Sequence, residues 1–138
     1  MTITLVPLKD LRPHEGVNSM HLAEIECDLM ADGMIKDPII VDAGSMIILD
    51  GHHRYNALKR MGYTYAPVYL VDYRSDRVTV DAWRKGEHVT KQDVLAAGLS
   101  GRLLPAKTSH HTLPGMLHHV NVPLALLREE NHADQLCS

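Results

Sequence analysis

Five polar or small residues span the junction between an apolar stretch at residues 47–49 and the first turn of a predicted helix. They are Asp50, Gly51, His52, His53 and Arg54. The first backbone N–H groups of a helix have no partner within the helix, and the helix dipole places partial positive charge there. Because three side chains in this segment can donate hydrogen bonds beside those amides, the pattern is typical of a phosphate-binding site. The carboxylate of Asp50 could hold Mg²⁺ or orient a substrate group.

The same residues also have a purely structural interpretation, in which Asp50 caps the helix and the histidines are solvated. For an isolated Asp-Gly pair that interpretation would be the better one. Four polar groups at one strand–helix junction favour ligand binding instead. Gly51 would also let a phosphate approach the backbone closely.

The rest of the sequence predicts the elements that must position this junction. Strands are predicted at residues 3–8, 39–41, 46–49, 65–71 and 78–82. Helices are predicted from Asn18 or Ser19 to Gly33, from His52 to Met61, and from a Thr90–Asp93 capping box to Gly98. Residues 101–115 are predicted to form a loop. This order indicates an α+β domain, with a mixed sheet and flanking helices.

Composition and charge exclude several classes of protein. With 138 residues, 45% hydrophobic and 22% charged, the chain is expected to form a single domain over residues 1–138. The formal net charge of −3, without a run of Lys and Arg, argues against nucleic-acid binding. No apolar run approaches the ~18–20 residues that span a bilayer. Because the first residues also lack signal-peptide features, a cytoplasmic protein is expected.

The segment from Asp50 to Arg54 resembles the nucleotide-binding motif of the ParB/sulfiredoxin superfamily, and within it that of the free L-serine kinases of the SerK/SbnI type. Three further features are similar to that family and follow the same order along the chain. They are residues 11–15 (Leu-Arg-Pro-His-Glu), Trp83, and residues 107–111 (Lys-Thr-Ser-His-His). The resemblance implies a ParB/sulfiredoxin-like catalytic domain. Such a domain would transfer a phosphoryl group from ADP or ATP to the hydroxyl of L-serine, giving O-phospho-L-serine.

The resemblance also implies a role for each matching residue. Glu15 would take the proton of the serine hydroxyl, and Asp50 would be a second catalytic group and the ligand of a Mg²⁺ cofactor. The nucleotide and phosphate contacts would be Gly51, His52, His53, Arg54, Lys107, Thr108, Ser109, His110 and His111. Trp83 and Asp28 would line the substrate pocket. The implied partners are L-serine and the nucleotide, bound by a monomer or small homo-oligomer.

One departure from the family concerns His110, which stands where these kinases usually have arginine. A neutral imidazole offers one N–H donor, whereas a guanidinium offers five and carries a fixed charge.

Other members of the superfamily fit the sequence less well. A sulfiredoxin needs a reactive cysteine in the strand–helix motif, where this chain has His52 and His53. A ParB-like DNA-binding regulator needs a basic surface and a further helical domain, and a ParB-like nuclease needs clustered acidic residues. The alternative that remains is a ParB-like nucleotide-binding regulatory module without turnover. Such a module would require neither Glu15 nor the segment that begins at Lys107.

Overall fold

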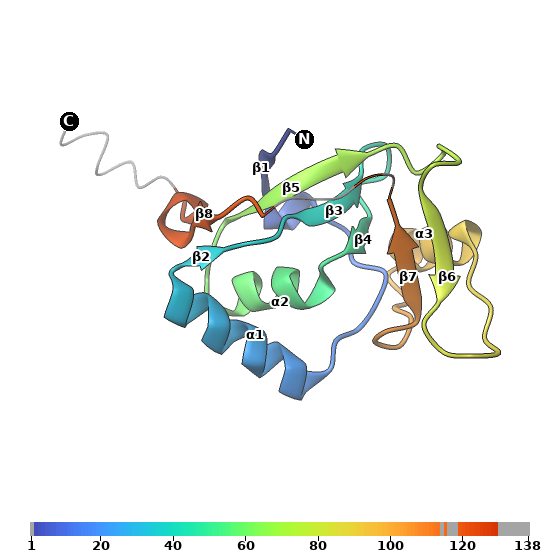
Figure 1. Cartoon of the computed structure of the whole chain (residues 1–138), viewed down its shortest axis with the longest axis horizontal. Coiled ribbons are helices and arrows are strands. Elements are labelled where there is room, and N and C mark those ends of the chain that lie inside the picture. Colours follow the sequence, from blue (N-terminus) through green and yellow to red (C-terminus); the bar gives the residue numbers. More distant parts are fainter. Residues whose placement is uncertain (1, 114, 116–118, 130–138) are drawn as a thin grey trace.

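Four strands form the central sheet of the computed structural model, which describes residues 2–113, 115 and 119–129 (Figure 1). In spatial order they are β1 (Thr4–Pro7), β5 (Tyr65–Val71), β3 (Ile39–Asp42) and β4 (Ile48–Asp50). The β3–β5 pair is parallel, whereas the β1–β5 and β3–β4 pairs are antiparallel. The predicted hairpin is therefore β3–β4, and the predicted α+β class with a mixed sheet is confirmed.

Both faces of the sheet are covered, and successive residues of β3 alternate between them. The helices are α1 (Ser19–Asp32), α2 (His52–Arg60) and α3 (Lys91–Ser100). Ile39 and Val41 pack in the cluster that includes α1 and α2, whereas Ile40 packs in the cluster that includes α3. Because side chains alternate along a strand, a strand buried on both faces is apolar throughout. No helix in the described residues has the length and apolar character needed to cross a membrane.

Two short ladders flank the central sheet. In one, β2 (Met34–Ile35) pairs with β8 (Val122–Pro123), and in the other β6 (Thr79–Ala82) pairs with β7 (Ser109–Thr112). Single 3₁₀ turns are formed by Leu8–Asp10 and Leu124–Leu127. The prediction of a continuous loop over residues 101–115 is therefore wrong. The Ser-His-His-Thr sequence of β7 has no strand pattern of its own, and pairing with β6 gives it this conformation.

The ends of α1 and the start of α3 follow the predicted signals. The side chain of Asn18 accepts a hydrogen bond from the amide of His21, and α1 ends at Gly33 with φ 67°. The capping box between Thr90 and Asp93 is present in both directions. These local signals are reliable because the capping groups are within three residues of each other.

The predicted end of α3 at Gly98 is wrong, since the helix continues to Ser100 and is capped by Gly101. Gly98 is needed for packing instead. A Cβ at this position would lie 2.6 Å from the side chain of Ile47, which packs against the helix from the sheet. The glycine therefore allows α3 to approach the sheet closely.

Candidate active site

The strand–helix junction predicted from the sequence is present in the structure. β4 ends at Asp50 and α2 begins at His52, with Gly51 between them at φ 104°. A Cβ at Gly51 would lie 3.3 Å from the Cα of Ile39 and 3.0 Å from the guanidinium of Arg54. The left-handed conformation and the crowding both require glycine here. Because glycine has no side chain to cap the helix, the first amides of α2 keep their capacity to bind an anion.

A small cavity of about 180 Å³ lies at this junction. It is lined by Glu15, His21, Ile25, Leu49, Asp50, Gly51, His52, His53, Arg54, Trp83, Lys107 and Ser109. A wider groove of about 650 Å³ shares His21, Trp83 and Lys107 with the cavity. Most of the residues predicted to form the site thus come together from four separate parts of the chain. His21 was not predicted, because nothing in the sequence of α1 distinguishes it from a surface residue.

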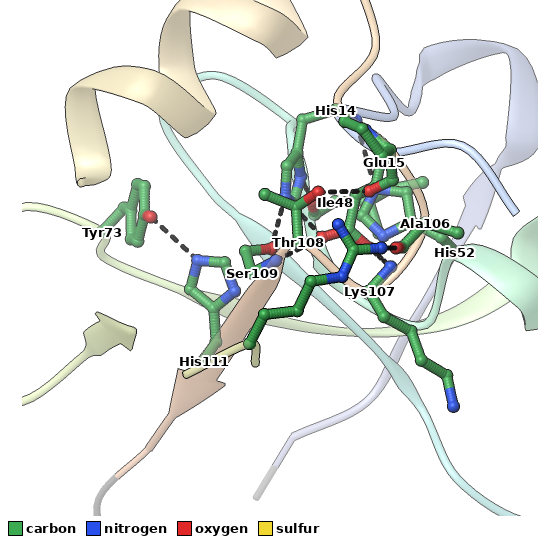
Figure 2. Close-up of polar contacts among 12 residues, drawn as sticks. His14, Glu15, Ile48, His52, Tyr73, Ala106, Lys107, Thr108, Ser109 and His111 are labelled. Atoms are coloured by element: carbon green, nitrogen blue, oxygen red, sulfur yellow. Dashed lines mark hydrogen bonds and ion pairs between the residues drawn. The ribbon is translucent and has the colours of Figure 1, made fainter. Parts of the chain in front are cut away.

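The carboxylate of Glu15 is buried and held by three donors from a distant segment (Figure 2). Its Oε1 accepts hydrogen bonds from the backbone N and the Oγ of Ser109, both at 2.7 Å. Its Oε2 accepts from the backbone N of Lys107 at 3.3 Å. Since a carboxylate has about four lone-pair positions, Glu15 keeps one for another partner. This acceptor lines the cavity, as a base requires.

His14 is fully buried behind Glu15, and sequence reasoning missed it. Its Nδ1 lies 2.6 Å from the carbonyl oxygen of Ile48, and its Nε2 lies 2.8 Å from the Oγ of Ser109. Burial lowers the pKa of His14, opposed by the Ile48 carbonyl and the charge of Glu15. The available signal was its position next to Glu15, but an Arg-Pro-His sequence is equally typical of a surface turn.

His52 and His53 connect the start of α2 to the segment that carries Glu15. Nε2 of His52 accepts from the backbone N of His14, and Nε2 of His53 accepts from the backbone N of Asn18, each at 3.1 Å. Burial, followed by neighbouring histidines, holds the pKa of His52 well below its usual value. Burial also lowers the pKa of His53. Since Nε2 of each ring accepts a hydrogen bond, the ring hydrogen of each is at Nδ1. A role in phosphate binding stays a prediction for both.

Arg54 and Asp50 supply opposite charges on one side of the cavity. A terminal nitrogen of Arg54 donates to the carbonyl of Pro38 at 3.1 Å and lies 3.8 Å from Asp50. The Nε of Arg54 is buried and has no hydrogen-bond partner in the part of the chain that the structure describes. Lys107 adds a second cation to the lining, and its backbone has φ 57°. A strained conformation of this kind is typical of a functional segment.

Four predicted site residues do not line the cavity. Thr108 uses its hydroxyl to donate to the carbonyl of Pro105, and Asp28 is exposed on α1. His110 stacks on Trp83, with ring centroids 4.1 Å apart, and so contacts a lining residue. His111 faces inward, and burial lowers its pKa to about 3.

The alternation of side chains along β7 separates these histidines. Ser109 and His111 point to one face, where Tyr73 Oη lies 2.8 Å from Nε2 of His111, while His110 points to the other. Nδ1 of His111 has no hydrogen-bond partner in the described residues. The nearby carbonyl of Leu49 raises the pKa of His111, but burial has the larger effect and lowers it. The matched segment thus divides its side chains between the interior and the rim.

Comparison of the sequence with known proteins gives matches over a little more than half of the chain. A ParB-like protein of Sulfolobus acidocaldarius is 40% identical over 77 residues, which are 56% of this chain and 38% of that protein. An ATP-dependent L-serine kinase of Staphylothermus marinus is 30% identical over 83 residues, which are 57% of this chain and 33% of the kinase. The matched region therefore spans only about a third of these relatives. No protein-family model matches the sequence.

Comparison with solved structures extends the likeness to nearly the whole chain. A free serine kinase in complex with AMP superposes with a TM-score of 0.82 at 18% identity, covering 91% of this chain and 93% of the kinase chain. At this level of identity the likeness establishes a shared fold. The resemblance predicted from the sequence is thus confirmed: this chain is similar in sequence to L-serine kinases and has the fold of a free serine kinase.

Proposed function

We propose that this protein is a kinase that transfers the terminal phosphoryl group of ADP or ATP to the hydroxyl of free L-serine. The catalytic domain would extend over residues 1–138. One observation carries the proposal: a buried carboxylate, Glu15, faces the same small cavity as the free amides at the start of α2. A proton acceptor and an anion-binding helix end are the two components that phosphoryl transfer to an alcohol requires.

Glu15 is the proposed acceptor of the serine proton. Phosphoryl transfer is achieved chiefly by positioning and charge stabilisation, with a base that receives the proton of the attacking hydroxyl. The three donors on Glu15 fix its orientation and leave one lone pair for the substrate. The substrate O–H bond breaks as its oxygen bonds to phosphorus, and the nucleotide leaves with the electrons of its own P–O bond.

The opposite side of the cavity would hold the phosphates of the nucleotide. The α2 amides supply partial positive charge, and Arg54 and Lys107 supply full charges. His52 and His53 would each contribute an Nδ1–H donor. Thr108 and His111, which face away in this structure, would reach the phosphates only after a local rearrangement. We therefore assign the phosphate contacts principally to Gly51, Arg54 and Lys107.

Asp50 would be the protein ligand of a Mg²⁺ ion. The described residues contain no cluster of three or more metal-binding side chains. Mg²⁺ in kinases is commonly bound by one or two carboxylates together with substrate phosphates and water, so a single exposed carboxylate at the cavity fits that role. When bound, the ion would neutralise charge on the transferring phosphates.

The substrate serine would bind between Glu15 and Trp83. The indole lines both the cavity and the wider groove, and it is 56% exposed. His21 and Ile25 of α1 line the same cavity, whereas Asp28, on an adjacent turn, does not. We therefore propose Trp83 rather than Asp28 as the principal substrate contact. The protein would act in the cytoplasm as a monomer or small homo-oligomer, without binding nucleic acid.

The alternative is a nucleotide-binding regulatory module without turnover. The ParB-like name of one relative is consistent with it. The position of Glu15 favours a kinase, because an acceptor-only carboxylate in a phosphate-binding cavity would repel a nucleotide unless it served another purpose.

Turnover separates the two functions. The protein is incubated with Mg²⁺, L-serine and ADP, ATP or CTP in separate reactions, and O-phosphoserine is measured by mass spectrometry. Formation of O-phosphoserine with ADP or ATP, well above a protein-free control, is the expected result. Tight binding of a nucleotide without any product would establish the regulatory function instead. L-Homoserine in place of L-serine tests the choice of acceptor.

A further inference from the structure

The contacts among His14, Ser109 and Glu15 require one more proton than the hydroxyl of Ser109 provides. This oxygen lies 2.8 Å from Nε2 of His14 and 2.7 Å from Oε1 of Glu15. The carbonyl of Ile48 only accepts, so Nδ1 of His14 carries the ring hydrogen, and Nε2 of the neutral ring is an acceptor. A carboxylate is likewise only an acceptor. The single hydroxyl hydrogen can therefore fill one of the two short contacts.

Both contacts are filled once Glu15 carries a proton. The carboxylic acid then donates to Oγ of Ser109, and the hydroxyl of Ser109 turns to donate to Nε2 of His14. No covalent bond of Ser109 or His14 changes, because the hydrogen bond between Ser109 and Glu15 only reverses its direction and a second one forms from Ser109 to His14. A neutral acid and a carboxylate are thus both accommodated by rotation of one hydroxyl group.

We propose that Ser109 and His14 form a hydrogen-bond switch that stabilises the protonated form of Glu15. This inference rests on the proposed kinase function, in which Glu15 becomes protonated by accepting the hydrogen of the substrate hydroxyl. His14 is then a positioning residue, since it acts on the substrate only through Ser109 and Glu15. The Ser109 hydroxyl thereby has a role other than the phosphate contact predicted from the sequence.

The switch requires a neutral His14 ring, and burial favours that form, although the Ile48 carbonyl and the charge of Glu15 oppose it. An imidazolium would present a donor at Nε2 and would fix the Ser109 hydroxyl toward Glu15. His14 is fully buried, and its ring contacts the rings of His52 from α2 and His111 from β7, with centroids 4.5 and 5.8 Å away. Burial lowers the pKa of each of the three histidines. Glu15 is the acidic group next to His14, at 3.9 Å between Oε1 and Nε2.

The chain offers a matched control for the Ser109 hydroxyl. Ser45 donates its backbone N–H and its hydroxyl to one oxygen of Asp42, at 3.0 and 2.6 Å, as Ser109 does with Glu15. No histidine is bonded to the Ser45 hydroxyl in the described residues, and neither residue lines the cavity. Ser45→Ala therefore removes the same chemical group from a carboxylate that takes no part in the proposed reaction.

Two substitutions of His14 separate its two ring nitrogens. Asparagine places an amide nitrogen the same number of bonds from Cα as Nδ1, so His14→Asn retains a donor to Ile48 and loses the acceptor for Ser109. Glutamine places an amide oxygen at the distance of Nε2, so His14→Gln restores the acceptor. Retention of the fold in each variant is checked by circular dichroism and by nucleotide titration of Trp83 fluorescence, since Trp83 is the single tryptophan of the sequence.

The pH dependence of kcat is the principal measurement. In His14→Asn the Ser109 hydroxyl can donate only to the carboxylate, so the acid limb is expected to move to lower pH by up to about one unit, with kcat about tenfold lower. KM for serine should stay within about twofold. His14→Gln should recover most of the loss. In a Ser109→Ala background His14→Asn should no longer move the acid limb, because His14 acts on Glu15 only through Ser109, whereas in a Ser45→Ala background it should move the limb as in the wild type.

These outcomes are distinct from those of a structural role. Equal losses in the Asn and Gln variants of His14, or an acid limb that His14→Asn still moves in a Ser109→Ala background, would overturn the proposal. If the His14 variants do not fold, a ¹⁵N measurement on the wild type and on Ser109→Ala still decides it.

A spectroscopic measurement tests the switch without turnover. The ¹⁵N spectrum of the wild-type protein should show His14 as a neutral Nδ1–H ring whose Nε2 signal moves in the hydrogen-bonded direction as Glu15 is protonated. The movement should be absent in Ser109→Ala. An imidazolium or an Nε2–H form would contradict the switch. Absence of O-phosphoserine in the wild type, with the Nε2 movement present, would remove the kinase function and leave the switch supported.

Discussion

Two serine–carboxylate pairs in this protein have the same hydrogen bonds and different surroundings. In the β3–β4 turn, Ser45 donates through N–H and O–H to Asp42, three residues away. At the cavity, Ser109 donates in the same way to Glu15, 94 residues away. Asp42 also accepts from the backbone N of Tyr73. Each of the two carboxylates therefore accepts three hydrogen bonds.

The same serine–carboxylate hydrogen bond stabilises a turn at Asp42 and orients a carboxylate that lines the cavity at Glu15. Burial alone would raise the pKa of Asp42, but its hydrogen bonds from Ser45 and Tyr73 outweigh burial and lower it. Asp42 therefore stays charged and holds the turn. Glu15 has three donors, one open position and a neutral histidine behind its serine. Glu15 also lines the cavity, which Asp42 does not, so Glu15 is the better candidate for a base.

Removal of the proposed base should produce the largest effect and is the most direct test of the comparison. Glu15→Gln keeps the length of the side chain but cannot accept the serine proton. Loss of a general base commonly costs ~10²–10⁴-fold, so kcat for O-phosphoserine formation should fall at least about a hundredfold. Nucleotide affinity, measured by calorimetry, should change little. A collapse of nucleotide affinity would show that Glu15 acts through the phosphates, and activity within a few-fold of wild type would make Asp50 the next candidate.

Local features such as helix caps could be predicted well from the sequence, whereas contacts between residues distant in the chain could not. The caps of α1 and α3 and the Asp50–Arg54 junction could be recognised because their signals lie within a few residues. Gly98 was misread as a helix end because its true constraint is Ile47, which comes from another part of the chain.

The environment of Glu15 could not be predicted for the same physical reason. By pattern it is a polar turn residue, and its burial depends on donors from the Lys107–Ser109 segment. The family resemblance implied a role for Glu15 as the proton acceptor. It gave no indication that His14 and Ser109 would be hydrogen-bonded to one another. Contacts between residues distant in sequence arise from the fold and have no local signal.

The second prediction concerns the structural pair. In Asp42→Asn, one amide oxygen replaces two acceptors, and the NH₂ group faces backbone donors. The free energy of unfolding should fall by about 1–3 kcal/mol, measured by urea denaturation. Turnover per folded molecule should be unchanged, because Asp42 does not line the cavity. A loss of kcat equal to that of Glu15→Gln would contradict the distinction between the two pairs.

The same variant has a defined pH dependence. The pKa of Asp42 is lower in the folded protein than its ordinary value of 3.8, so the carboxylate contributes stability above that pH. This contribution is lost as pH falls through the folded value. The difference in stability between wild type and Asp42→Asn should therefore be constant near neutral pH and should shrink below about pH 4. A difference that is largest in acid would contradict this sign.

A third prediction addresses the substrate side of the cavity. Trp83 is mostly exposed and contacts His110, so Trp83→Ala should change stability by less than about 0.5 kcal/mol. If the indole contacts serine, KM for serine should rise about tenfold, with a smaller effect on kcat. Calorimetry measures nucleotide affinity in this variant, since fluorescence is lost. An unchanged KM would assign the serine pocket to α1 instead.

The smallest expected effect is that of introducing at His110 the arginine that the resemblance to the serine kinases implies. The His110 ring stacks on Trp83 at the rim of the cavity, and a guanidinium can stack on indole in the same way. His110→Arg adds a permanent charge there, so nucleotide affinity at pH 8 should rise by about two- to fivefold with kcat unchanged. His88→Arg is the matched control, because His88 is exposed and lies outside the cavity. Equal gains in both variants would show a general effect of net charge. A gain confined to His110→Arg would show that the rim of the cavity contributes to phosphate binding.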